Sequence, residues 1–191
     1  MNLLVLGPQG AGKGTQAKRI SREHDLLHIS TGERFRHEIA AGTEFGRRVE
    51  AVLAAGELVP DELTIGLIRE RLGEDDARAG FVLDGFPRNI AQAEALDYLL
   101  AALDRPLSAV LEFELPDEVS VERLLGRATE ESRIDDTPDA IARRLEIYHR
   151  ETATLSEHYR ARGKLVGIHA DRSIDEVWAD IERALSQAVP A

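Results

Sequence analysis

The sequence predicts an α/β fold in which one parallel sheet is covered by helices on both faces. Short apolar segments recur along the 191 residues, and the longer stretches between them mostly repeat apolar residues every three or four positions. Strands that alternate with helices in this way build an open parallel sheet. A glycine-rich turn follows the first apolar segment, where a strand would pass into a helix. The expected strands are Leu3–Leu6, Leu27–Ile29, Phe81–Leu83, Ala109–Leu115 and Leu165–Ile168.

The first strand runs directly into the turn Gly7-Pro-Gln-Gly-Ala-Gly-Lys-Gly-Thr15. Such a turn ahead of a helix points successive backbone N–H groups into one concavity, at the positive end of that helix. A polyphosphate fits there, and Lys13 can reach its outer phosphates as a point charge. The pattern G-x-x-x-x-G-K-[ST] is met except at its last position, where Gly14 replaces the residue that contacts magnesium and Thr15 follows. We therefore expect a nucleoside triphosphate site.

Polar residues mark where several helices begin. Ser and Thr accept hydrogen bonds from the first helical turn, and a Glu three residues later can complete a capping box. The last helix has an apolar face that we interpret as core. The possible capping boxes are Ser30/Glu33 and Ser173/Glu176, and two further helix starts are Pro116-Asp117 and Thr137-Pro138. The apolar face of the last helix consists of Val177, Ile181 and Leu185, with Trp178 beside it.

Two stretches interrupt the regular alternation of strands and helices. Residues 30–59 carry helical patterns but no strand, and residues 127–136 are polar and join two helices. Both would leave the sheet at its carboxyl edge, where open α/β folds bind their ligands. They could equally be two surface connections, since composition alone does not separate these interpretations.

Composition narrows the classes of function. A net charge of −11 argues against nonspecific binding of nucleic acid, and the absence of cysteine excludes disulfides and thiolate metal sites. The six histidines show no ligand spacing, so we read them as structural or solvated. No apolar run approaches the roughly 18 residues of a membrane span, and no signal peptide precedes the first strand. We expect a cytoplasmic protein without a membrane partner.

A second motif, Phe81-Val-Leu-Asp-Gly-Phe-Pro-Arg88, lies about 70 residues after the first. An apolar strand that ends in Asp84 beside a phosphate loop supplies a carboxylate toward magnesium, directly or through water. Gly85 and Pro87 then force a turn that presents Arg88 at the edge of the sheet.

The two motifs together resemble those of adenylate kinases, a family of nucleoside monophosphate kinases, and the resemblance covers essentially the whole chain. Further matching segments are Ser30–Arg36, Leu58–Asp61, Gln92, Glu114–Glu118, Arg123 with Arg127, Arg133 with Asp135 and Asp136, and Arg143–Tyr148. The chain departs from the family at Glu33, where Asp is usual, and at Arg34, where an apolar residue is common and where we expect a solvated side chain.

This resemblance implies a P-loop three-layer fold with a central five-stranded parallel sheet and a single kinase domain over residues 1–191. Residues 1–29, 60–126 and 137–191 would form its core. Residues 30–59 would form a small helical lobe that binds the nucleoside monophosphate, and residues 127–136 a short lid. The family's long lid often carries zinc on four cysteines, so a structural zinc is not expected in this chain.

The resemblance also implies the residues of two nucleotide sites. The ATP site would comprise Gly10, Ala11, Gly12, Lys13, Gly14, Thr15, Arg127 and the backbone of Arg172. The AMP site would comprise Thr31, Arg36, Glu57, Leu58, Val59, Gly85, Phe86, Pro87, Arg88, Gln92, Arg133 and Arg144. The groups expected to act in catalysis are Lys13, Arg88, Arg123, Arg133 and Arg144.

Two of these assignments have alternatives. Arg123 and Arg127 are spaced to share one helix face, which could also be a solvated basic face. Arg144 could instead pair with Glu146 or Glu151 on its own helix.

The implied reaction is the reversible transfer of a phosphoryl group from Mg²⁺-bound ATP to AMP, giving two ADP, by a monomer. Phosphoryl transfer needs positioning and charge neutralisation more than a protein nucleophile, so a set of arginines is the expected machinery. Closure of the lobe and the lid over both substrates would exclude water, which would otherwise hydrolyse ATP.

Two other functions are considered. A UMP/CMP-type kinase is disfavoured by Thr31 and Gln92, because a Gln amide can pair with the donor and acceptor edge of adenine. A nucleotide-dependent switch or binding module without turnover is disfavoured because lysine occurs at positions 13, 18 and 164 alone, so no guanine-reading Asn-Lys-x-Asp segment exists. A relative of the kinases without catalytic activity would be expected to have lost some of the arginines that match the family, and this chain keeps them.

Overall fold

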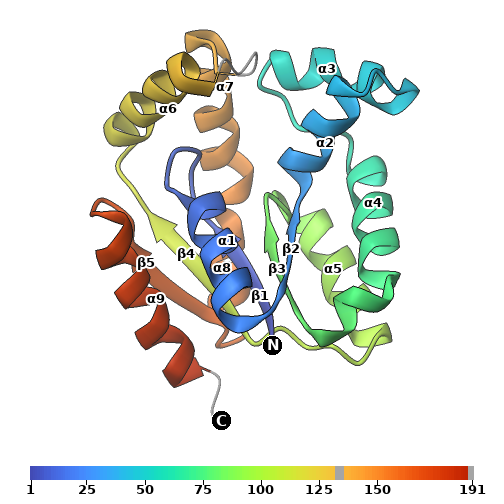
Figure 1. Cartoon of the computed structure of the whole chain (residues 1–191), viewed down its shortest axis with the longest axis vertical. Helices are drawn as coiled ribbons and strands as arrows, with labels where there is room; N and C mark the ends of the chain where they lie inside the picture. The colour runs from blue at the N-terminus through green and yellow to red at the C-terminus, as the bar shows by residue number, and fades with distance from the viewer. Residues whose placement is uncertain (132–135, 189–191) are drawn as a thin grey trace.

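The computed structural model describes residues 1–131 and 136–188 (Figure 1). At its centre lies a five-stranded sheet in which all paired strands are parallel, with the order β2-β3-β1-β4-β5. The five expected strands are confirmed to within one residue at each end, so the predicted α/β class is correct. The strands are β1 (Asn2–Leu6), β2 (Leu27–Ser30), β3 (Phe81–Asp84), β4 (Ala109–Glu114) and β5 (Leu165–His169).

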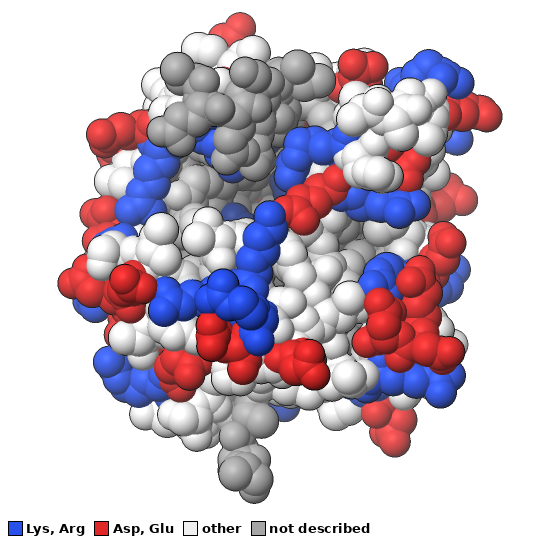
Figure 2. Space-filling view, in the orientation of Figure 1, with Lys and Arg blue, Asp and Glu red and all other residues white. Residues whose placement is uncertain are grey.

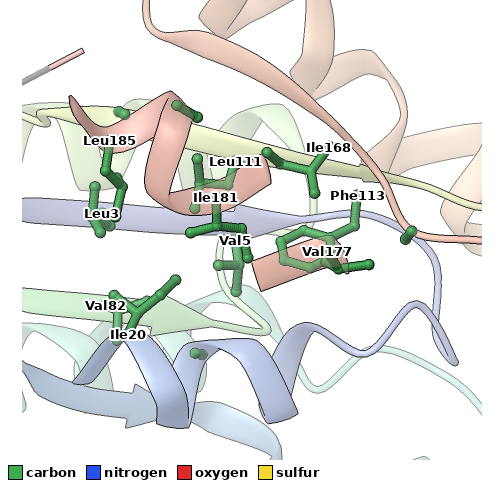
Figure 3. Packing of buried hydrophobic residues seen from close by; sticks show 14 of the residues in the cluster. Leu3, Val5, Ile20, Val82, Leu111, Phe113, Ile168, Val177, Ile181 and Leu185 are labelled. Atoms are coloured by element: carbon green, nitrogen blue, oxygen red, sulfur yellow. The ribbon is translucent and has the colours of Figure 1, made fainter. Parts of the chain in front are cut away.

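Helices cover both faces of this sheet and make three layers. On one face, α1 and α9 pack against the strands, with Ile20 and Ile181 fully buried (Figure 3). On the other face, α4, α5 and α8 contribute buried side chains such as Ile68, Leu96 and Tyr159. The helices are α1 (Lys13–His24), α2 (Thr31–Ala40), α3 (Glu44–Ala54), α4 (Asp61–Gly73), α5 (Ile90–Ala102), α6 (Asp117–Glu131), α7 (Pro138–Ile147), α8 (Thr154–Arg160) and α9 (Ile174–Ala188), with short helical turns η1 (Asp75–Ala79) and η2 (Tyr148–Thr152).

Residues 30–59, and the helices α6 and α7 on either side of residues 132–135, lie at the carboxyl end of the sheet. Helices α2 and α3 pack on each other around a small apolar cluster that includes Phe35, Val49 and Val59, and α4 packs against this cluster through Leu63 and Leu67. Helices α6 and α7 share another cluster with Leu124, Ile141 and Leu145. Figure 1 shows these two helix pairs on opposite sides of the carboxyl edge.

Helix α6 continues to Glu131, beyond the residue at which we expected the lid to begin. The segment from Arg127 to Glu131 contains neither glycine nor proline, so nothing in it ends the helix. Arg127 is therefore a helical residue, on the same helix as Arg123. Residues 132–135, and with them the expected site residue Arg133, lie outside the described residues.

The predicted helix starts are mostly confirmed. Ser173 and Glu176 form the reciprocal bonds of a capping box, and Thr137 caps α7 with Pro138 in its first turn. Ser30 caps α2, but the carboxylate of Glu33 pairs with Lys18 at 2.7 Å instead of completing the box. Among the described residues, no helix is both long enough and apolar enough to cross a membrane.

Candidate active site

A cleft of about 400 Å³ opens at the carboxyl edge of the sheet, between α2–α3 and α6–α7. Figure 2 shows a hollow on this side of the molecule, with Lys and Arg side chains at its edge. Most of the residues predicted from the sequence line this one cleft. They are Gly10, Gly12, Lys13, Gly14, Thr15, Thr31, Arg36, Glu57, Leu58, Val59, Asp84, Gly85, Arg88, Gln92, Arg123, Arg127 and Arg144.

Of the predicted residues that the structure describes, four do not line the cleft. Ala11, Phe86 and Pro87 are buried beside it, within the phosphate loop and the turn after β3. The exposed side chain of Arg172 pairs with Asp180 on α9 at 3.2 Å. The role of the Arg172 backbone toward a nucleotide stays a prediction.

The glycine-rich turn leaves the start of α1 open to the cleft. Gly12 is the N-cap of α1 in a left-handed conformation, and no side chain caps the first turn. A Cβ at Gly12 would meet no atom within 4 Å, so this glycine serves the backbone conformation and does not fill a packed space. The first N–H groups of the helix therefore remain available to an anion.

Lys13 bends back over this turn. Its Nζ donates to the carbonyl oxygens of Gly7 at 2.8 Å and Pro8 at 2.6 Å. Burial lowers the pKa of the Lys13 ammonium to about 8, and the carboxylate of Asp84 opposes that shift. Three guanidinium groups add to the lowering, those of Arg88, Arg127 and Arg144. The cleft thus concentrates positive charge at one point.

The replacement of Ser or Thr by Gly14 has a structural reason. A Cβ at this position would lie 3.2 Å from Oδ2 of Asp84, so a larger side chain would press on that carboxylate. Asp84 ends β3 and reaches the phosphate loop with its side chain 15% exposed. The described residues contain no cluster of three or more His, Cys, Asp or Glu that could enclose a metal ion. One carboxylate beside a phosphate site suits Mg²⁺, which keeps several waters and takes further ligands from the phosphates.

Asp136 joins two of the predicted arginines. Its carboxylate has no exposed surface, and it accepts from Arg127 at 2.7 and 2.8 Å and from Arg144 at 2.5 Å. Burial raises the pKa of Asp136, but the hydrogen bonds from both arginines outweigh burial and hold it below its usual value. Both guanidinium groups are thereby fixed at the wall of the cleft.

The alternative pairing of Arg144 within its own helix is not observed. Glu146 instead pairs with Arg143 at 2.7 Å and with Arg150 at 3.3 Å, and Glu151 pairs with Arg150. Arg123, which also lines the cleft, contacts the loop after β5. It donates to the carbonyl of Ala170 at 3.1 Å.

On the opposite wall, the turn after β3 binds the start of α2. Gly85 has φ +83°, and a Cβ there would lie 2.7 Å from Oγ1 of Thr31, so both backbone conformation and space require glycine. The carbonyl of Gly85 accepts from Thr31 Oγ1 at 3.0 Å and from Arg88 Nε at 2.9 Å. The side chain of Arg36 lies close to Gly32 on the same wall.

Comparison with known proteins agrees with this geometry. The family model described as adenylate kinase matches residues 5–164. The chain belongs to the adenylate kinase family. It is 46% identical over 185 residues to an adenylate kinase of Stenotrophomonas maltophilia, which covers 97% of this chain and 99% of the relative. It is 47% identical over 188 residues to that of Parvibaculum lavamentivorans (97% and 92%) and 46% over 187 residues to that of Xanthomonas euvesicatoria (98% and 100%).

Adenylate kinase family membership confirms the resemblance drawn from the two motifs, but residue-by-residue roles stay predictions. The structure adds residues to the cleft that the sequence did not single out, including Gln9, Lys18, Phe35, Leu53 and Thr64. The sequence marks Asp136 only as part of a matching segment, whereas the structure pairs it with Arg127 and Arg144.

Gln92 differs from expectation in one respect. The sequence suggested an amide available to adenine, but in the structure both ends of the amide already have protein partners. Oε1 accepts from the backbone N–H of Arg88 at 2.8 Å, and Nε2 donates to Oδ1 of Asp61 at 2.7 Å. An amide oxygen accepts two hydrogen bonds and an NH₂ group donates two, so each end retains capacity for a ligand.

Proposed function

We propose that this chain transfers a phosphoryl group reversibly from Mg²⁺-bound ATP to AMP, giving two ADP. Its place in the adenylate kinase family supports this reaction. The observation that carries the proposal most directly is the convergence of Lys13, Arg88, Arg127 and Arg144 on one cleft, with the phosphate loop on one side and Thr31 and Gln92 on the other. Such a cleft suits two nucleotides that meet through their phosphates.

On the donor side, the N–H groups at the start of α1 and the ammonium of Lys13 would hold the phosphates of ATP. Arg123 and Arg127 lie on α6 and would neutralise charge from the other side. Magnesium bound with ATP would shield the phosphate oxygens, and Asp84 would hold that ion directly or through water. These groups would stabilise the transition state through charges that are already in place, and this stabilisation is largest in a cleft that excludes water.

On the acceptor side, Arg36 and Arg88 would hold the phosphate of AMP, and Gln92 would contact its base. Arg144 would lie over the phosphoryl group as it passes between the nucleotides. The acceptor phosphate is already an anion, so the protein needs neither a nucleophile nor a general base. The role of the chain is to place that oxygen in line with the γ-phosphate.

The domain division remains part of the proposal. We propose a single domain with the core 1–29, 60–126 and 137–191, an AMP-binding lobe 30–59 and a short lid 127–136. The apolar cluster around Phe35 and Val49, which partly buried Leu63 and Leu67 of α4 join to the core, supports a lobe that can move as a unit on α4. Its closure over both substrates would exclude water. Monomeric state and cytoplasmic location also stay proposals, which light scattering and cell fractionation would test.

A UMP/CMP-type kinase and a nucleotide switch without turnover are not favoured by the family. A coupled assay with Mg²⁺-bound ATP and each of AMP, UMP, CMP and GMP tests the choice. We expect kcat/KM for AMP to exceed the others by at least about tenfold, which corresponds to roughly 1.4 kcal/mol. Equal rates with UMP would reject the choice of base and leave the kinase reaction standing. Absence of turnover with every monophosphate would reject the reaction itself.

A further inference from the structure

Asp61 holds the amide of Gln92 from behind the cleft. Asp61 stands at the start of α4 and does not line the cleft, whereas Gln92 lines it and is only 2% exposed. Oδ1 of Asp61 accepts from Nε2 of Gln92 at 2.7 Å. Asn89 holds the carboxylate in turn, donating from Nδ2 to Oδ1 at 3.0 Å and to Oδ2 at 3.2 Å. Asn89 also caps α5 by accepting from the backbone N–H of Gln92.

This arrangement permits only one orientation of the Gln92 amide. A carboxylate only accepts hydrogen bonds, so Asp61 must face the NH₂ group. The backbone N–H of Arg88 only donates, so it must face the oxygen, which it does at 2.8 Å. A flipped amide would set the oxygen against the carboxylate and the NH₂ group against an N–H donor. A buried polar group that loses its partner in this way is costly.

The fixed orientation of the Gln92 amide determines which purine base can pair with it. Adenine presents its N6 amino group as a donor next to a ring nitrogen that accepts, which matches the remaining oxygen lone pair and N–H of Gln92. Hypoxanthine and guanine carry an oxygen at position 6 and a proton on N1, so along the edge formed by position 6 and N1 they present an acceptor and a donor where adenine presents a donor and an acceptor. Pairing with those bases through the same edge would require the flipped amide.

We propose that Asp61 is a positioning residue for base specificity: by locking the amide of Gln92, it makes the acceptor site accept a 6-aminopurine monophosphate and reject a 6-oxopurine one. This inference rests on the proposed function, in which Gln92 contacts the base of AMP. Specificity of this kind comes from the penalty imposed on the wrong ligand as much as from contacts to the right one.

The substitution Asp61→Asn tests the lock, because an Asn amide has the same shape and can either donate to or accept from Gln92. IMP is the probe, since it differs from AMP only in the oxygen at position 6 and the proton that this places on N1. We expect the ratio of kcat/KM for AMP to that for IMP to fall about tenfold. The change should appear mainly in the two KM values, and equilibrium binding of AMP and IMP without ATP should show the same loss of discrimination.

The matched control is Glu62→Gln, which removes a charge from the same first turn of α4 at an exposed side chain. Its AMP to IMP ratio should equal that of the parent. In a Gln92→Leu background, Asp61→Asn should have no further effect on the ratio, whereas a merely structural role would act with or without Gln92. If Asp61→Asn does not fold, Asp61→Ser removes the same obligate acceptor at a position where a helix tolerates Ser.

The two proposals fail in different ways. A parent protein that does not phosphorylate AMP would reject the proposed function. A parent that prefers AMP, combined with an Asp61→Asn variant that keeps the full AMP to IMP ratio, would reject the role of Asp61 alone. The same conclusion would follow if Glu62→Gln changed the ratio as much as Asp61→Asn does.

Discussion

Asp136 and Arg144 form an ion pair of 2.5 Å at the wall of the cleft, and the carboxylate has no exposed surface. Arg127 binds the same carboxylate from α6, so one buried anion connects two helices and two arginines that face the nucleotide cleft. The arginines are thus ordered before any phosphate arrives. Preorganised charge of this kind needs no rearrangement at the moment of reaction.

We expect Asp136→Asn to weaken both the fold and the reaction. Breaking one partner of a buried ionic network leaves charge without compensation, so the free energy of unfolding should fall by about 1–3 kcal/mol. Looser arginines should lower kcat/KM for AMP and ATP by about tenfold or more. Urea unfolding and the coupled assay measure these effects. Asp139→Asn, an exposed change in the first turn of α7, is the control and should alter neither quantity.

The stabilisation from Asp136 should depend on pH. Its pKa lies below the usual value because of the arginines, so the unfolded chain binds a proton more readily than the folded protein does. The contribution is fully present above the unfolded pKa of about 3.9 and is lost as the pH falls through the lowered folded pKa. Urea unfolding from pH 7 to pH 3 should show the difference between parent and Asp136→Asn shrinking below about pH 4. A constant difference would contradict this coupling.

Lys13 gives a separate prediction, because its pKa in the nucleotide-free protein is about 8. Phosphates favour the charged ammonium and should raise that pKa on binding. ATP binding at pH 8 should therefore take up about half a proton, and more at pH 9. Calorimetry in buffers of different ionisation enthalpy measures this uptake, which Lys13→Met should abolish. Equal uptake in parent and variant would assign the proton to another group.

The fold could be predicted from the sequence because its signals are local. Each strand is a short apolar run, and the glycines and Lys13 of the phosphate loop are neighbours in the chain. The network around Asp136 is different, since Arg127 lies 9 residues before it on α6 and Arg144 lies 8 residues after it on α7, and no local motif joins the three. Asp61 lies 31 residues from Gln92 and reaches it only because α4 and α5 pack together. Such contacts follow from tertiary packing and carry no pattern in the sequence.

Removal of metal ions distinguishes an ion that enters with the nucleotide from an ion that stabilises the fold. The chain has no cysteine, and its cleft offers Asp84 as the carboxylate nearest the phosphate loop. EDTA should therefore abolish turnover, added magnesium should restore it, and the Tm of the nucleotide-free protein should stay unchanged. A large drop in that Tm on chelation would reveal a metal that holds the fold.

The lobe formed by residues 30–59 should close when both nucleotide sites are filled. Its apolar cluster reaches the core through Leu63 and Leu67 of α4, and an ion pair of 2.6 Å between Glu57 and Arg143 connects it to α7. A ligand that joins two adenosines through a chain of phosphates would occupy both sites at once, so it should bind much more tightly than AMP or ATP alone. It should also protect amides of residues 30–59 from hydrogen exchange more than either mononucleotide does. Amides of β1, buried at the centre of the sheet, provide the control and should exchange alike in every state. Equal exchange of residues 30–59 with and without the joined ligand would mean that this lobe does not close.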